Sequence, residues 1–105
     1  MRSGAVDAER IFAALDAYLL AGLVFGVCYW LLARLDPSAF NEINLSLARA
    51  TYFSFVTLAT LGYGDIVPRS ELVQSLAIVE AVGGQMYLAV LIARLVSLYS
   101  RQSEI

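Results

Sequence analysis

The sequence has 105 residues, of which 60 % are hydrophobic and 15 % are charged. A soluble domain of this length buries too little of its surface to hide so many apolar side chains, so the composition favours a membrane protein. The net charge of −2 argues against a nucleic-acid partner, and a single cysteine (Cys28) without any histidine excludes an intrachain disulfide framework and a Cys/His metal site.

Residues 1–16 combine several charges with Ile11, Phe12 and Leu15 at helical spacing. This pattern predicts either a short helix in the membrane interface or an N-terminal extension of the first membrane helix. The charges, and the lack of a small-residue cleavage site after a short apolar core, indicate a retained segment rather than a cleavable signal peptide.

The first uncharged block runs from Ala17 to Ala33, and its 17 residues are just enough for a membrane-spanning helix. We predict an outer helix over residues 17–35, with Trp30 and Arg34 near one membrane surface. The Asp36-Pro37 pair ends this helix, because proline disfavours a helical conformation in the residue before it.

A second apolar pattern over residues 45–59 is too short to cross a bilayer and runs directly into Thr60-Leu61-Gly62-Tyr63-Gly64-Asp65. We predict a half-helix that enters the membrane and returns to the same side as an extended loop, with Asn44 or Ser46 as its N-cap. The C-terminal carbonyls of such a half-helix, near residues 57–59, carry partial negative charge that stabilises a cation at the membrane centre.

The last apolar segment predicts an inner helix over residues 71–99, with Ser70 as its N-cap. Glu80 is the only charged side chain in the apolar part of this helix. Arg94 and Arg101 lie at its far end, where we expect them to anchor the helix at the lipid headgroups.

The order of these segments predicts an all-α membrane protein in which two transmembrane helices flank a re-entrant pore helix and an extended loop, all within a single domain of residues 1–105. A Gly-Tyr-Gly run at membrane depth leaves backbone carbonyls without water, which is useful where those carbonyls replace the hydration shell of a cation. For successive carbonyls to point the same way, the backbone must alternate between right- and left-handed conformations. Gly62 and Gly64 adopt the left-handed ones at little cost.

The loop after the half-helix resembles the selectivity filter of tetrameric potassium channels, and the chain resembles the small bacterial members of that family with two membrane helices. The resemblance implies a homotetrameric pore that binds dehydrated K⁺ through backbone carbonyls and a threonine hydroxyl, with no cofactor other than permeant K⁺. The implied filter residues are Thr60, Leu61, Gly62, Tyr63 and Gly64, with K⁺ bound by the carbonyls of the first four and by the Thr60 hydroxyl.

Side chains beside the filter are expected to support it. The Tyr63 ring is predicted to pack against Tyr52 and Phe53 of the half-helix. Some relatives carry a glutamate that hydrogen-bonds the aspartate after the filter, and Val56 occupies that position here. Asp65 is therefore expected to lack this partner, and slow inactivation that depends on the pair is expected to be weak.

Two further positions depart from the pattern of the family. Leu61 stands where the usual filter has valine, and its unchanged carbonyl is expected to preserve the ion sites. Val67 stands where some relatives have an aromatic residue, which predicts poor block by external tetraethylammonium.

Glu80 is an ionisable group inside a membrane span, and such groups face protein rather than lipid. We predict that it packs behind the half-helix in a scaffold role. Its predicted hydrogen-bond partners are Ser54, Thr57 or Tyr52.

The Gly83-Gly84 pair weakens the inner helix by up to about 1 kcal/mol per glycine. Two interpretations are open: close packing against another helix, which is common in membranes, and the gating hinge that the family places at Gly84. One helical face near this pair carries the predicted pore-lining residues Gln85, Leu88, Ile92 and Val96.

The resemblance predicts a multi-pass channel that conducts K⁺ passively, with membrane lipids and other copies of the chain as its partners. It places the protein in the inner membrane of a bacterium, with both termini in the cytoplasm. Two alternatives are a weakly selective monovalent cation channel and a non-conducting helical subunit that regulates another membrane protein. An enzyme is not predicted, because the sequence offers no nucleophile–base pair, metal ligands or phosphate loop.

Overall fold

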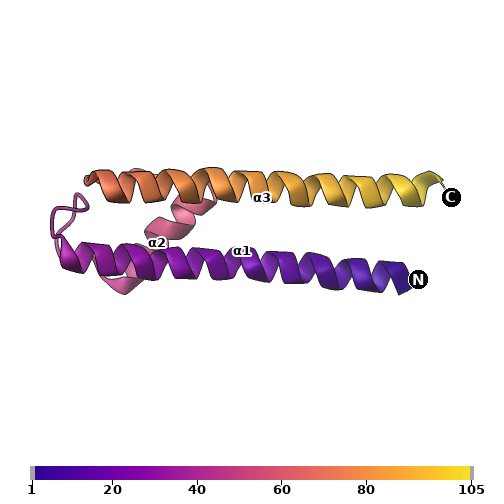
Figure 1. Cartoon of the computed structure of the whole chain (residues 1–105), viewed down its shortest axis with the longest axis horizontal. Helices are drawn as coiled ribbons and strands as arrows, with labels where there is room; N and C mark the ends of the chain where they lie inside the picture. The colour runs from indigo at the N-terminus through magenta and orange to yellow at the C-terminus, as the bar shows by residue number, and fades with distance from the viewer. Residues whose placement is uncertain (1, 105) are drawn as a thin grey trace.

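The computed structural model describes the backbone of residues 2–104 and the side chains of residues 8–98 and 100. It contains three helices over this range, α1 (Arg2–Leu35), α2 (Leu47–Leu58) and α3 (Glu71–Glu104), and no strand. The two long helices run antiparallel and side by side, so both ends of the chain lie at the same end of an elongated molecule. Helix α2 crosses obliquely behind them near the other end (Figure 1).

The three helices lie where the sequence predicts helical segments, but their first and last residues differ from the predicted ones. Residues 2–16 extend the first helix, so the alternative of a separate interfacial helix is wrong. Helix α2 begins at Leu47 rather than residue 45, because the Ser46 hydroxyl caps it by accepting the Arg49 N–H at 3.1 Å. Helix α3 continues to Glu104, beyond the predicted end at residue 99.

Helices α1 and α3 are each long and apolar enough to cross a membrane. The qualifying segments are Ala8–Leu35 and Glu71–Leu98, each of 28 residues, or about 42 Å of helix against about 30 Å of hydrocarbon. Only 11 % of each apolar window is buried within the chain. The core helix of a soluble protein would be mostly buried, so these two helices need lipid or other copies of the chain to cover them.

A cluster of aromatic side chains joins α2 to α1 and to the loop between them. Tyr29, Phe40 and Phe53 meet edge to face, with ring centroids 5.0–6.1 Å apart. Smaller apolar residues complete this buried cluster: Ala39, Leu45, Ala50, Ile66 and Val73. The core therefore lies at the loop end of the molecule, where it fixes the base of α2.

Small residues allow α2 to approach both long helices closely. A Cβ atom at Gly26 would lie 2.9 Å from the Thr51 Cα, and one at Gly22 would lie 2.5 Å from the Phe55 ring. On the α3 side, a Cβ atom at Gly84 would lie 2.7 Å from Leu58. The half-helix is therefore held between glycine surfaces on α1 and α3.

Candidate functional site

The segment after α2 has an alternating backbone. Thr60, Gly62 and Gly64 have positive φ angles of 60°, 57° and 80°, whereas Leu61 and Tyr63 between them do not. Such alternation turns successive carbonyls toward the same side of the extended segment, which is the arrangement that a row of ion sites needs. The sequence predicts the left-handed conformation of the two glycines. It does not predict the left-handed conformation of Thr60.

Hydrogen bonds to the last turn of α2 hold the start of this segment. The Thr60 N–H donates to the Thr57 carbonyl at 3.1 Å, and the Leu61 N–H donates to the Val56 carbonyl at 2.9 Å. The Val56 side chain itself is buried. Val56 thus supports the segment through its main-chain oxygen.

The outer surface of this segment is open in the single chain. Leu61 is 56 % exposed, Tyr63 is 66 % exposed, and neither Gly62 nor Gly64 has a neighbour that a Cβ atom would meet within 4 Å. Residues 61–64 therefore have room for contacts with other chains.

The Tyr63 ring stacks on Tyr52, with centroids 6.5 Å apart and an interplanar angle of 13°. The expected contact with Phe53 is wrong, because Phe53 lies in the aromatic core with Tyr29 and Phe40. These side chains leave α2 on different faces, so only Tyr52 reaches the filter segment.

Tyr52 also supplies Asp65 with a partner that the sequence did not suggest. The Tyr52 hydroxyl donates to Asp65 Oδ2 at 2.9 Å, and the Ile66 N–H donates to Oδ1 at 3.1 Å. The hydrogen bond from Tyr52 lowers the pKa of Asp65, with smaller contributions from backbone N–H groups and the positive charge of Arg49. The family's glutamate is absent, as expected, but Asp65 is not left without a side-chain partner.

Asn41 was missed by sequence analysis and holds the segment that follows the filter. Its side-chain amide donates to the Asp65 carbonyl at 3.1 Å, and its side-chain oxygen accepts the Val67 N–H at 2.9 Å. Its own N–H donates to the Val67 carbonyl at 3.0 Å. The loop between α1 and α2 therefore fixes residues 65–67, which follow the alternating segment, and nothing local in the sequence marks Asn41 for this contact.

Glu80 lies behind α2, as predicted, and is 2 % exposed. Of the predicted partners only Ser54 reaches it, with the two side-chain oxygens 2.6 Å apart. The Tyr29 hydroxyl donates to the other carboxyl oxygen at 2.8 Å. Tyr29 was missed, because 51 positions separate it from Glu80 along the chain.

The C-terminal end of α2 meets both long helices. The Tyr18 hydroxyl donates to the Leu58 carbonyl at 3.0 Å, which satisfies one of the free carbonyls at this helix end. The Tyr18 ring stacks on Tyr87 of α3 at 6.0 Å. Sequence analysis missed both tyrosines.

Helix α3 runs without a break through the glycine pair. Gly84 is packed against Leu58, as the close-packing interpretation requires, and Gly83 has open space around it. The gating hinge stays a prediction. Of the predicted pore-lining residues, Leu88 is half-buried within the chain, and the others are exposed: Gln85, Ile92 and Val96.

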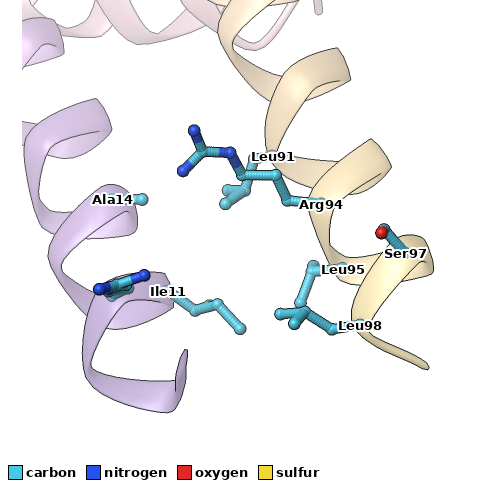
Figure 2. A pocket seen from close by; sticks show the side chains of 8 residues that line it. Ile11, Ala14, Leu91, Arg94, Leu95, Ser97 and Leu98 are labelled. Carbon is cyan, nitrogen blue, oxygen red and sulfur yellow. The ribbon is translucent and has the colours of Figure 1, made fainter. Parts of the chain in front are cut away.

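At the end of the helices away from the filter, α1 and α3 border a cavity of about 370 Å³. Arg94 extends from α3 toward Ala14 of α1 over an apolar floor that includes Leu91 (Figure 2), and Arg10 of α1 also lines the cavity. The side chain of Arg101, the second predicted headgroup anchor, lies outside the described ones.

The sequence of this chain is similar to those of known proteins. A family model described as an ion channel matches residues 13–101. The chain belongs to this ion channel family. Membership confirms the predicted membrane channel fold, and ion channels are not enzymes, as the sequence also indicated.

Three relatives illustrate the similarity. Two-pore potassium channel 4 of Arabidopsis thaliana is 44 % identical over 79 residues, which are 75 % of this chain and 27 % of the relative. Two-pore potassium channel 3 of the same plant is 33 % identical over 89 residues, which are 85 % of this chain and 19 % of the relative. The inward rectifier potassium channel Kirbac3.1 of Paramagnetospirillum magnetotacticum is 28 % identical over 88 residues. These residues are 80 % of this chain and 28 % of the relative. The chain thus spans less than a third of each of these relatives.

Proposed function

We propose that four copies of this ion channel chain surround a common axis and conduct K⁺ passively through a filter formed by residues 60–64. The observation that carries this proposal is the alternating backbone of Thr60, Gly62 and Gly64, combined with the open space beside them. A single chain contributes one row of carbonyls, and a monovalent cation that has lost its water needs oxygens on all sides. Closed fourfold symmetry supplies them with one kind of contact between neighbours.

Two observations support potassium as the permeant ion. The run Thr60-Leu61-Gly62-Tyr63-Gly64 has the filter pattern of potassium channels apart from one leucine, whose carbonyl is unchanged. The relatives described above are themselves named as potassium channels. The proposed ion sites are the carbonyls of Thr60, Leu61, Gly62 and Tyr63, with the Thr60 hydroxyl at the inner end.

We place the filter near the outer face and both ends of the chain at the cytoplasmic face, as in the inner membrane of a bacterium. In this orientation the cavity beside Arg10 and Arg94 lies at the inner headgroup level, about 36 Å of helix from Arg34. Two arginines over an apolar floor suit the phosphate and acyl chain of an anionic lipid.

Ion flux from liposomes tests the proposal. The purified chain is reconstituted alone, and K⁺ and Na⁺ efflux are compared under matched gradients. We expect K⁺ efflux to exceed Na⁺ efflux by at least a factor of about ten, which corresponds to about 1.4 kcal/mol of discrimination. Equal rates for the two ions would instead indicate a weakly selective cation channel, and no flux of either ion would refute conduction by this chain.

A further inference from the structure

The Ser54 hydroxyl on α2 lies between two other oxygen atoms and close to both. The Gly22 carbonyl of α1 is 2.6 Å away, and Glu80 Oε2 of α3 is also 2.6 Å away. Both distances are those of short O–H···O hydrogen bonds. Because the lone pairs of two oxygens repel at this separation, each contact requires a proton between its two atoms.

Counting the available protons identifies the donor of the second bond. A serine hydroxyl supplies one proton, and a peptide carbonyl supplies none. The Gly22 carbonyl therefore takes the Ser54 proton, and the contact with Glu80 needs a proton from the carboxyl group. If Glu80 were ionised, one of the two 2.6 Å contacts would lack a proton.

We propose that Glu80 is a neutral carboxylic acid in the folded chain at neutral pH and donates its proton to Ser54. The Tyr29 hydroxyl donates to the other carboxyl oxygen at 2.8 Å, so the chain of donors runs from Tyr29 through Glu80 and Ser54 to the Gly22 carbonyl. Every proton in this chain is used once. Glu80 is thereby a positioning residue, because it fixes α2, which carries the filter, against α1 and α3.

The surroundings of Glu80 favour the neutral form. Ser54 and Glu80 are both almost completely buried, at 0 % and 2 % exposure, and an unpaired buried charge is strongly unfavourable. Tyr29 and Tyr18 face Glu80 from α1, and Ser54 faces it from α2. Within the described residues no arginine and no second carboxylate approaches it.

The cavity next to Glu80, of about 300 Å³, is consistent with this assignment. It is lined by apolar residues together with Tyr18 and Tyr87, and its lining contains no arginine, lysine or second acidic residue besides Glu80. Among the described residues of α3, none with a positive charge lines this cavity.

Retention of this proton makes the stability of the fold fall as the pH rises above the ordinary pKa of a glutamate. An unfolded glutamate is ionised at neutral pH, so the folded chain binds one proton more than the unfolded chain. Stability therefore falls as the pH rises, which is the direction required when the native state holds the extra proton. Loss of the proton leaves Ser54 one proton short and releases α2 from one of its neighbours.

Infrared spectroscopy of the whole chain in lipid vesicles reads the protonation state directly. We expect the carbonyl stretch of a protonated carboxylic acid at neutral pH in the wild type and in Glu71→Gln, which removes an exposed carboxylate at the start of α3. The band should be absent from Glu80→Gln. A wild-type spectrum without it at neutral pH would overturn the proposal. This result does not depend on whether the chain conducts K⁺.

Thermal stability in mild detergent gives a second, independent test. The Glu80→Gln side chain reproduces the neutral acid, because its N–H group donates to Ser54 and its oxygen accepts from Tyr29. We expect this variant to match the wild type only below the ordinary pKa of a glutamate, about 4.3, and to be the more stable of the two at neutral and alkaline pH. If Glu80→Gln loses stability at neutral pH while the wild type shows no dependence on pH, Glu80 is ionised and the inference is wrong.

Discussion

Thr60 is a β-branched residue held in a left-handed conformation, with φ of 60°. For an L-residue this conformation costs about 1–2 kcal/mol, and it persists only where the surroundings determine it. The Thr60 N–H donates to the Thr57 carbonyl, and its hydroxyl donates to the Ala59 carbonyl at 2.6 Å. The strain at this residue therefore begins the alternation that the two glycines continue.

Substitution of Gly62 by alanine tests the requirement for this alternation. Gly62 has φ of 57°, so Gly62→Ala is expected to strain each chain by about 1–2 kcal/mol and to reduce K⁺ flux from liposomes at least about tenfold. Gly83→Ala is the matched control, because Gly83 is helical and has open space around it. Unchanged flux in Gly62→Ala would show that the left-handed conformation is not needed for conduction.

The contact between Tyr52 and Asp65 predicts a dependence on acid pH. The hydrogen bond from Tyr52 lowers the pKa of Asp65, so the stability that the pair contributes is present above the ordinary aspartate pKa and is lost as the pH falls through the lowered value. Tyr52→Phe removes the donor and is expected to move the acid limb of the flux–pH profile to higher pH.

Tyr63→Phe is the control for this experiment. It retains the ring that stacks on Tyr52 and removes a hydroxyl that makes no hydrogen bond within the described residues. Its acid limb should coincide with that of the wild type. If both variants shift equally, the effect comes from the loss of phenol groups near the filter rather than from the bond to Asp65.

At the scale of elements, the position of α2 decides where the filter lies. A helix of 12 residues is marginal by itself, so its place is set by packing rather than by helix propensity. Gly22 and Gly26 lie one turn apart on α1 and form the surface on which α2 rests. Gly84 and the Tyr18 hydroxyl meet its C-terminal end from the two long helices.

Alanine substitutions on this surface should differ in a defined order. Gly26→Ala places a Cβ atom 2.9 Å from the Thr51 main chain and is expected to destabilise the fold by about 1–3 kcal/mol. Gly22→Ala meets the Phe55 ring, which can rotate away, so its effect should be smaller. Gly83→Ala meets nothing within 4 Å and should stabilise α3 by up to about 1 kcal/mol.

Thermal unfolding of the three variants in detergent measures this order. Equal effects of Gly22→Ala and Gly26→Ala would contradict the distinction between main-chain and side-chain contacts.

The sequence predicts the helices and the left-handed glycines after α2 because these depend on local patterns. Apolar length marks the spans, and the glycines at positions 62 and 64 mark the left-handed conformations. The residues that hold the filter in place depend on contacts between distant positions. Tyr18 and Leu58 are 40 positions apart, and Asn41 and Asp65 are 24 apart, so no window of sequence reveals them.

One missed feature did have a signal. Gly22 and Gly26 have the four-residue spacing typical of close helix contacts in membranes, and their position in the first span pointed to a packing surface. Tyr52 and Phe53 are both aromatic residues of the half-helix, but neighbouring residues on a helix point in different directions, and Phe53 packs into the core. Helical geometry alone separates the two aromatic residues.

At the scale of the whole molecule, one chain leaves most of its apolar surface and its filter segment uncovered. The bilayer covers part of the two long helices, but lipid cannot supply oxygens to an ion at the filter. In the proposed tetramer, three further copies of the chain would supply the missing carbonyls and would cover Leu61 and Tyr63. Assembly and conduction are therefore expected to be inseparable.

Mixing experiments measure how many chains form one pore. If wild type and Gly62→Ala assemble at random in equal amounts, and one strained chain disables a tetramer, about one-sixteenth of the assemblies contain four wild-type chains. We expect K⁺ flux to fall as the fourth power of the wild-type fraction, whereas mixing with Gly83→Ala should leave flux unchanged. Flux that falls in direct proportion to the wild-type fraction would mean that each chain conducts alone, and a third-power dependence would mean a trimer, so the shape of this curve decides between one shared pore of four chains and any other assembly.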